Sequence, residues 1–583
     1  MEAKNEKAIG NWLLDVEGET LCLPNFQRWG VWKPSNICKF FKTLIVYDKS
    51  PVGIFLVLPT NKSAPLFVPR KITDGLKPQT GVCNAFLLDG QQRLSALWKA
   101  FHDADEEEYR YYIEFNDQFE IKDVKERKKD TKADQRLNQN PTEQYKEHWF
   151  PVTLLNPLSD IEIVNNWLQQ LDLQKLKIDN CNSIENLIMN TRKIFAREKQ
   201  GGRIIPHFQL DDAIDEKVAI SIYETINSNS VKLSDYYLAV AKMERETGES
   251  LYDMADRLIK RAPLIKVLET DEIGELILKI SCVLRGKIPS GGNCKNLNFN
   301  KVLKNESKIF NGVEWAIEKL NDLKIWDGSQ LPSVVPLRVL PALHQHIPES
   351  ELQKADINEI ITKYLWHAFL TDRYSKQANS RLKEDYDGLR NFLDGTWKWA
   401  RDKKKMNIFD KDKNLHPSLD SIKEAGWPRS VKILARGILL VCCQKGAKTL
   451  TCGEEFSYSK YKEKEYEKHH IFPKSKLQKK VGHSGNYVLN CLLVPKEDNR
   501  KYGNDLPGNY IRKLFKDLGK PLSPVKVVKH LETHLLSEQM AEMLVEVTQE
   551  AIDNDQIILK DAYNEFIDAR AHDVGTKIKE LLR

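Results

Sequence analysis

The chain has 583 residues, which is too long for one hydrophobic core and predicts two or three domains. Charged residues make up 30% of the chain and the net charge is +6, a balance that permits a nucleic-acid partner without requiring one. The first residues, MEAKNEKAIG, lack the apolar stretch of a secretory signal. The most apolar window, Val431–Cys443, contains Lys432 and Arg436 and is too short to span a bilayer. We therefore expect a cytoplasmic protein with no membrane partner.

Ten cysteines are scattered along the chain without a C-x2-C pair. In a chain of this size, that pattern indicates reduced thiols rather than a disulfide framework. Cys442, Cys443, Cys452 and Cys491 could form a zinc knuckle, but their irregular spacing favours buried or free thiols.

In the first half, short apolar runs at Ile54–Leu58 and Ala85–Leu88 predict buried strands. From Glu106 to Glu147 the sequence becomes highly charged and loses its apolar rhythm. This segment indicates an exposed insertion, either a mobile loop that contacts DNA or, as we favour, a solvated connector.

From about Ser159 onward, apolar residues recur at helical spacing, and a buried helix is also expected over Lys432–Cys442. The clearest helical segments are Lys217–Ile226, Leu233–Met243, Ile273–Leu284 and Ile357–Leu370, with further helical patterns across Val525–Glu550 and Asp561–Leu582. The lysine-rich segment Arg401–Lys413 suggests a junction into the last domain. We expect a mainly helical α+β protein with domains at 1–245, 246–425 and 426–583.

The C-terminal segment EKHHIFPKSKLQKKVGHSGNYVLNCLLVPKEDNRKYGND carries a histidine pair followed by two spaced asparagines. It resembles the HNH, or ββα-metal, nucleases, in which a hairpin and a helix hold one divalent ion. By this resemblance His470 is the general base and His469 a metal ligand, at a position where many of these enzymes have Asp. Asn490, which closes the apolar run YVL, braces the loop that carries the base, and Asn499 is the second ligand.

Phosphodiester hydrolysis explains these residue types. A neutral imidazole can take a proton from water at cellular pH, and a cation stabilises the charge that builds on the phosphate. Mg²⁺ or Mn²⁺ is expected, although the imidazole ligand also suits Ni²⁺ or Zn²⁺. Neighbouring residues of a strand point to opposite faces, so both histidines serve one site only if the backbone turns locally, near Pro473.

Three further polar residues lie in the same segment. Lys474 and Arg500 are candidate contacts to the DNA phosphates, at even odds with ordinary exposed charge. His483 is more readily explained as polar surface than as a ligand.

Near the N-terminus, AFLLDGQQRLSALWKAF predicts a strand, a turn at Asp89-Gly90 and a helix from Gln91. One face of that helix carries Leu94, Leu97, Trp98 and Phe101. A turn that leads into a helix presents amide groups that attract phosphate. Arg93 could grip a phosphate and Asp89 a metal or ribose hydroxyl, although such a turn is most often a simple connector.

Together with PNFQRWGVW and PVGIFLVL, this motif resembles a bacterial family defined by a DGQQR signature, with a ParB-like N-terminal domain. The segment at 222–243 also resembles that family, with Asn229-Ser230 where a Gly is common. Members that add an HNH domain are relatives of GmrSD, the type IV restriction enzymes, and of SspE. The resemblance implies a nucleoside triphosphate site formed by Asp89, Gly90, Gln91, Gln92 and Arg93, with Gln27 and Arg28 beside it. The chain has no Walker A motif, so this site would be unlike a P-loop.

These observations favour a modification-dependent DNA endonuclease of phage defence, regulated by NTP binding or hydrolysis in the N-terminal domain. Its partner would be modified duplex DNA, and a homo-oligomer is compatible with this assignment. Two alternatives stay open. One is a nucleotide-dependent DNA-binding protein with an inactive nuclease domain, and the other is a toxin that cleaves RNA.

Overall fold

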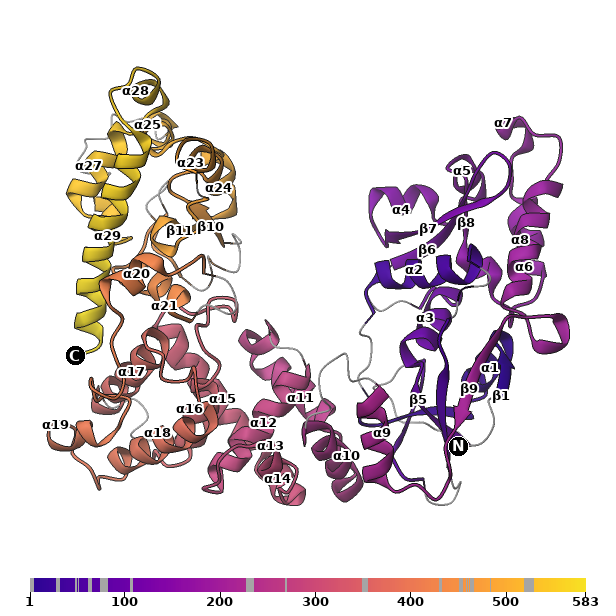
Figure 1. Cartoon of the computed structure of the whole chain (residues 1–583), viewed down its shortest axis with the longest axis horizontal. Coiled ribbons are helices and arrows are strands. Elements are labelled where there is room, and N and C mark those ends of the chain that lie inside the picture. The colour runs from indigo at the N-terminus through magenta and orange to yellow at the C-terminus, as the bar shows by residue number, and fades with distance from the viewer. Residues whose placement is uncertain are drawn as a thin grey trace. The chain divides into compact units, whose positions relative to one another are not determined.

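The computed structural model divides into two compact units, Met1–Gly248 and Glu249–Arg583, which are described separately (Figure 1). The residues described are 5–27, 32–47, 50, 52–60, 65–73, 82–104, 109–226, 235–267, 270–348, 355–428, 433–449, 454–457, 459, 461, 466–482, 484–517 and 529–583. The protein combines strands and helices and is mainly helical, as the sequence predicted.

The N-terminal unit is built on a six-stranded mixed sheet with the order β1-β9-β3-β5-β2-β4. Its strands are β1 (Asn5–Ala8), β2 (Leu21–Pro24), β3 (Phe55–Pro59), β4 (Pro69–Arg70), β5 (Ala85–Asp89) and β9 (Ile204–Gln209). At its centre β3 pairs antiparallel with β5 and parallel with β9. The two strands predicted from apolar runs are thus confirmed as β3 and β5, each within one residue of its expected bounds.

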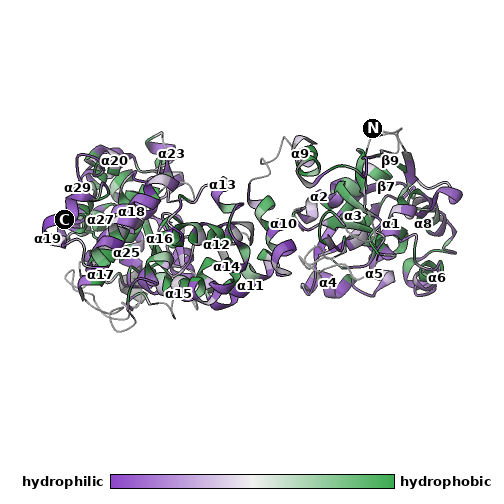
Figure 2. Cartoon of the chain, turned by 90° about the horizontal axis from the view of Figure 1, so that it is seen from below, coloured by the Kyte–Doolittle hydropathy of each residue, from purple (hydrophilic) through white to green (hydrophobic). Residues whose placement is uncertain are grey.

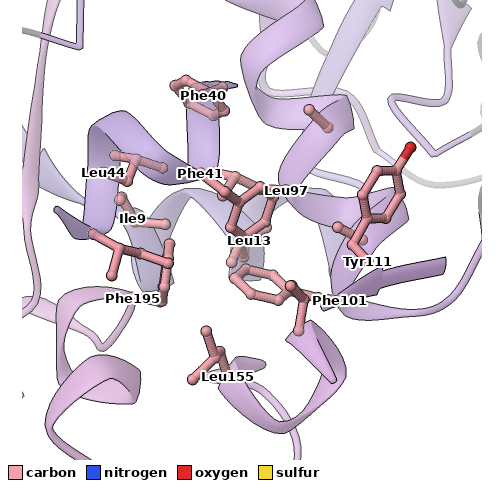
Figure 3. Close-up of a cluster of buried hydrophobic side chains, with 14 of the residues drawn as sticks. Ile9, Leu13, Phe40, Phe41, Leu44, Leu97, Phe101, Tyr111, Leu155 and Phe195 are labelled. Carbon is pink, nitrogen blue, oxygen red and sulfur yellow. The ribbon is translucent and has the colours of Figure 1, made fainter. Parts of the chain in front are cut away.

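Helices cover this sheet and enclose a large apolar core. They are α1 (Ile9–Glu17), α2 (Pro34–Ile45), α3 (Gln91–Phe101), α6 (Glu162–Gln169), α7 (Leu173–Leu176), α8 (Asn182–Ile194), α9 (Glu216–Ile226) and α10 (Asp235–Thr247). Phe41, Phe101 and Phe195 meet in this core, with the centroids of Phe101 and Phe195 5.0 Å apart (Figure 3). Burial of such rings is the main source of stability for the sheet that carries the DGQQR motif.

The charged segment predicted to be an exposed insertion forms a second sheet in its described part, so both the loop and the connector interpretations are wrong. This sheet has three antiparallel strands, β6 (Tyr109–Phe115), β7 (Ile121–Lys128) and β8 (Trp149–Pro151). The short helices α4 (Lys132–Leu137) and α5 (Pro141–Lys146) lie between β7 and β8 in the sequence. Ile113 and Val124 pair across the strands and are buried, while Arg110 forms ion pairs with Asp103 and Asp134. The charges therefore belong to the outer face of a strand, where alternate residues meet solvent.

The C-terminal unit is mostly helical. Its longer helices are α11 (Leu251–Arg261), α12 (Thr270–Leu284), α15 (Glu306–Asp322), α16 (Pro336–His344), α17 (Ala355–Leu370), α18 (Ala378–Leu393), α21 (Ile433–Cys442), α25 (Pro507–Asp517), α27 (Glu538–Glu546) and α29 (Leu559–Leu581). Shorter helices are α13 (Gly291–Cys294), α14 (Phe299–Lys304), α19 (Trp399–Asp402), α20 (Leu419–Glu424), α23 (Lys474–Lys480), α24 (Lys496–Tyr502) and α28 (Gln549–Asp553). Hydrophobic and hydrophilic residues alternate along many of these helices, as in amphipathic helices that cover a core (Figure 2).

The predicted helices are confirmed as α9, α10, α12, α17, α21 and α29 to within a few residues. Helix α17 packs against α21 and α29, so the predicted boundary at 425/426 falls inside one compact unit. The Asn229-Ser230 turn lies outside the described residues.

Cys22 and Cys83 are joined by a disulfide, with 5.9 Å between their Cα atoms, which corrects the expectation of reduced thiols for this pair. Cys442, Cys443 and Cys491 are free and buried, whereas Cys452 lies outside the described residues. Within the described part of the chain, no helix combines the length and apolar character needed to cross a membrane.

Candidate functional site

The histidine pair lies on β10 (Tyr466–His470), which pairs antiparallel with β11 (Cys491–Pro495). Strand β11, with the sequence CLLVP, is buried throughout and anchors the hairpin. His469 faces Leu492 across the ladder, so β10 keeps its strand geometry through both histidines. β10 ends at His470, and the predicted local turn follows directly, as a bend at Ile471 and Phe472 beside Pro473.

His469 points toward α24, which packs across the hairpin. Its Nδ1 lies 2.9 Å from Oδ1 of Asn499, and its ring meets the edges of Tyr502 and Tyr510. Only 3% of His469 is exposed, and this burial lowers its pKa to about 4, so the ring is neutral at physiological pH. The other ring nitrogen, Nε2, is buried and has no hydrogen-bond partner among the described residues.

The pair formed by His469 and Asn499 fits a divalent ion. In the structure this contact is a hydrogen bond in which Nδ1–H donates to the amide oxygen. An ion would replace that hydrogen once the proton sits on Nε2, and octahedral bonds of about 2.1 Å separate neighbouring ligand atoms by about 3.0 Å. The side-chain amide of Asn499 donates to Glu467 at 2.7 Å, which directs its oxygen toward His469. Among the described residues, no group of three or more His, Cys, Asp or Glu side chains could hold a metal. Mg²⁺ commonly takes one or two protein ligands and fills its other positions with water or phosphate.

His470 lies on the opposite face of β10 and is half-buried. Its ring stacks on Trp427, with centroids 3.9 Å apart and an interplanar angle of 12°. Its Nε2 lies 2.9 Å from Oδ1 of Asn486. Because that oxygen can only accept, Nε2 carries the proton and Nδ1 is the basic position of the ring. Burial lowers the pKa of His470, which keeps the neutral form that a general base requires.

Asn490 is fully buried and fastens the segment that follows the histidine pair. Its Oδ1 accepts from the backbone N–H of Phe472 at 2.8 Å, and its Nδ2 donates to the carbonyls of Phe472 and Gly485, each at 3.0 Å. Asn490 closes the apolar run YVL as the last residue of a 3-10 turn, Val488–Asn490, and β11 begins after it, so Asn490 precedes a strand and does not end one. Val488 and Leu489 are buried in the core, whereas Tyr487 is 38% exposed.

The two candidate DNA contacts are exposed. Lys474 opens α23, and its charge contributes, after burial, to lowering the pKa of His470. Arg500 is on the exposed side of α24, one residue after Asn499. His483 lies outside the described residues.

Sequence reasoning missed four residues that complete this site. Glu467 could have been found, because it is two residues before His469 and so shares its strand face. Trp427, Asn486 and Arg570 carried no local signal. Arg570 is fully buried on α29 and donates to the carbonyls on both sides of Asn490, those of Leu489 and Cys491.

The DGQQR motif of the N-terminal unit forms the predicted strand, turn and helix. Gly90 adopts φ +107°, and a side chain there would meet the ring of Phe55, so only glycine fits the turn. The predicted inner face of α3 is confirmed, with Leu94, Leu97 and Phe101 buried and Trp98 half-buried.

Arg93 is held by the protein itself. Its guanidinium pairs with Asp89 at 2.9 Å and donates to the carbonyls of Val52 and Ile54 at 2.8 and 3.0 Å. These contacts tie the start of α3 to the segment before β3. These bonds use three of the five N–H groups of the guanidinium, and the predicted nucleotide site stays a prediction.

The glutamines of this region also have protein partners. Gln92 accepts a hydrogen bond from the backbone N–H of Trp32, and Gln91 is buried. Gln27 is buried, and its Nε2 donates to the carbonyls of Leu87 and Leu88, each at 2.9 Å. Its Oε1 has no partner among the described residues. Arg28 lies outside the described residues.

The N-terminal part of the chain is similar to a known family. Residues 9–243 match the family model of the GmrSD restriction endonuclease N-terminal domain. The whole chain is similar to an uncharacterized protein of Methanocaldococcus jannaschii, with 23% identity over 611 aligned positions that cover 97% of each chain. The similarity to GmrSD supports a restriction-type endonuclease and hence a protein that binds DNA.

Proposed function

We propose that the chain is a metal-dependent DNA endonuclease of phage defence that cuts modified DNA under nucleotide control, with its cutting centre on the β10–β11 hairpin. The similarity of residues 9–243 to a restriction endonuclease domain supports the DNA substrate. The observation that carries the cutting centre is the approach of His469 Nδ1 to Asn499 Oδ1, 2.9 Å apart, on a strand whose next residue is His470.

The residues divide the chemistry among them. His470, oriented by Trp427 and Asn486, takes a proton from the attacking water at Nδ1. His469 and Asn499 would hold the divalent ion, which neutralises charge on the phosphate when it is bound. Asn490 keeps the segment after His470 in place, so that the base and the ligands stay in fixed relation.

The N-terminal unit would supply recognition and control. The turn before α3 and the buried Oε1 of Gln27 provide polar groups for a nucleoside triphosphate. Binding there would exchange a protein partner of Arg93 for phosphate and release the segment at Val52 and Ile54. That exchange is a local two-state element that a nucleotide can bias.

A cleavage assay on paired modified and unmodified duplexes tests this proposal. Each duplex is incubated with and without Mg²⁺ or Mn²⁺ and with and without NTP, using wild type and His470→Ala. We expect cleavage that needs the ion, prefers modified DNA and disappears in His470→Ala. His572→Ala, which changes an exposed histidine of α29, is the matched control and should cleave normally.

Other outcomes would replace the proposal. Binding of modified DNA without cleavage under any condition would indicate a nucleotide-dependent DNA-binding protein. Preferential cleavage of RNA would indicate a toxin. Equal cutting of plain and modified DNA, unaffected by NTP, would retain the nuclease and remove its regulation.

A further inference from the structure

A cavity of about 180 Å³ lies in the C-terminal unit, beside the strand that carries the histidine pair. The residues that define its chemistry are Lys324, Trp326, Arg436, Tyr461, Tyr466 and Lys468. They come from the segment after α15, from α21 and from β10 with the residues before it. Neither the proposed catalysis nor the resemblance to known nucleases assigns a function to this cavity.

Aromatic rings form one wall of the cavity. Tyr461 and Tyr466 are stacked, with centroids 5.3 Å apart and an interplanar angle of 16°, and Trp326 lies 5.6 Å from Tyr461. Because the two tyrosines stack on each other, a flat conjugated ligand would stack on the remaining face of one of them, which is favourable for any nucleobase regardless of sequence.

Positive charge dominates the polar groups that line the cavity. Arg436 donates to the carbonyl of Leu331 through one nitrogen, while its Nε is buried and has no partner among the described residues. Lys324 and Lys468 add two more cations, and Lys324 is paired with Glu455 at 3.4 Å. The carboxylate of Glu467 also lines the cavity, so three cations and one anion leave a positive surplus. Three cations beside an aromatic wall match a base that carries a phosphate.

The cavity is next to the proposed general base. Tyr466, Lys468 and His470 alternate along β10 and therefore share one face of the strand. Two residues of a strand span about 7 Å, so the lysine that lines the cavity is one such step from the imidazole. A nucleotide near the phosphate attacked at His470 could therefore place its base in the cavity.

We infer that this cavity is a nucleobase pocket, which receives an unstacked base next to the phosphate being cut. The inference rests on the proposed nuclease function for its source of ligand, a base of the DNA strand. A free nucleotide has the same chemistry and could fill the same pocket, so the test separates the two sources. Taking a base out of the stack costs energy that stacking on Tyr461 and Tyr466 would offset.

The test is photocrosslinking of the full-length His470→Ala chain in Mg²⁺. One arm uses a duplex with 5-iodouracil at each thymine position in turn, and the other uses 5-iodouridine triphosphate. Iodouracil crosslinks to aromatic rings stacked on it, and mass spectrometry locates the bond. We expect crosslinks from the duplex to Trp326, Tyr461 or Tyr466. Crosslinks from the triphosphate alone would assign the pocket to a free nucleotide, and crosslinks only outside the cavity would overturn the inference.

Variants of Tyr461 provide a second measurement. Tyr461→Leu removes the ring and should weaken DNA binding roughly 10-fold, whereas Tyr461→Phe keeps the ring and should bind like its parent. Tyr47→Leu makes the same change at a tyrosine of the N-terminal unit that is 52% exposed and should have no effect. Equal affinity of Tyr461→Leu and its parent would refute the pocket.

A failure of the pocket inference can be distinguished from a failure of the proposed nuclease function. Wild-type cleavage of the same duplexes reports on the nuclease. Cleavage without crosslinks in the cavity removes only the pocket, and crosslinks without cleavage remove only the nuclease. Thermal unfolding of each variant verifies that lost binding is not lost folding.

Discussion

Glu467 accepts a 2.7 Å hydrogen bond from the side-chain amide of Asn499, 32 residues further along the chain. Because this contact uses Nδ2 of Asn499, its oxygen is left to face His469 at 2.9 Å. A side-chain amide can present either its oxygen or its nitrogen to a neighbour, and only the oxygen can coordinate a metal ion. Glu467 thus determines which end of Asn499 the site presents.

Replacing Glu467 with alanine should therefore weaken the metal site. Loss of a partner that orients a ligand typically costs about 10- to 100-fold in metal affinity or activity. We expect a Mn²⁺ titration of cleavage to shift to higher concentration by that factor, with partial recovery in Glu467→Gln, which keeps one acceptor oxygen. Glu497→Ala, an exposed change in the first turn of α24, should leave the titration unchanged. An unchanged titration for Glu467→Ala would show that Asn499 is not a ligand.

Asn490 and Asn486 should separate folding from activity. Asn490→Ala leaves the N–H of Phe472 and two carbonyls without partners in the core, so we expect a loss of about 2–4 kcal/mol in the free energy of unfolding. Asn486→Ala removes a single contact, to His470, at a half-buried position. It should unfold like wild type but cleave more slowly. Urea denaturation and cleavage rates on the same samples check both expectations, and equal stability of the two variants would contradict them.

The residue types and order of the C-terminal motif could be predicted from sequence because they are local. The spacing of His470, Asn490 and Asn499 placed them on a strand, near a second strand and on a helix. The partners of the histidines could not be predicted. Trp427 precedes β10 in the sequence and Asn486 lies between β10 and β11, so their contacts with His470 depend on the tertiary fold. Contacts of this kind leave no periodic pattern in the sequence.

The strands of the charged segment at 106–147 were not predicted from the sequence. The apolar alternation of a strand pair is limited there to Ile113, Val124 and a few neighbours, and the many charged residues mask it. The charged residues are satisfied by pairs such as Arg110 with Asp134, which lies beyond the hairpin in sequence. Composition alone could not distinguish a solvated linker from a strand whose outer face is charged.

A buried ion pair of the N-terminal unit should be costly to break. Arg70 on β4 donates to Glu244 on α10 at 2.6 Å, and Asn25 donates to the same carboxylate at 3.0 Å. Only 3% and 8% of the two charged side chains are exposed. Removing one partner leaves a buried charge, so Glu244→Ala should cost about 3–5 kcal/mol in unfolding free energy.

The double change Arg70→Met with Glu244→Leu should recover most of that loss, because it removes both charges. Glu147→Ala is the control within the same unit, since its pair with Arg136 is well exposed and should contribute less than about 1 kcal/mol. Chemical denaturation of the three variants measures these differences. A double variant as unstable as Glu244→Ala would show that packing, not charge, holds α10 to the sheet.

The C-terminal unit should lose stability in acid because three of its histidines, His367, His469 and His534, are buried in the neutral form. Burial lowers the pKa of His534 to about 4 and that of His367 to about 3. An unfolded histidine titrates near ~6.5, so below that pH the unfolded chain binds protons that the folded chain excludes. The stabilisation is complete above pH 6.5 and is lost as the pH falls toward these lower values. At pH 4.5 each of these histidines should have lowered the free energy of unfolding by about 2–3 kcal/mol relative to neutral pH.

Urea midpoints measured from pH 7.5 to 4.5 test this expectation. His534 donates from Nε2 to the carbonyl of Lys448 at 2.7 Å, and glutamine can replace that donor without titrating. His534→Gln should therefore flatten the fall in stability by roughly a third, since His367 and His469 still titrate. His572→Gln changes an exposed histidine of the same unit and should reproduce the wild-type slope. If His534→Gln also follows that slope, the acid sensitivity has another source, such as protonation of a carboxylate whose pKa the fold lowers, like that of Asp402 beside Arg401.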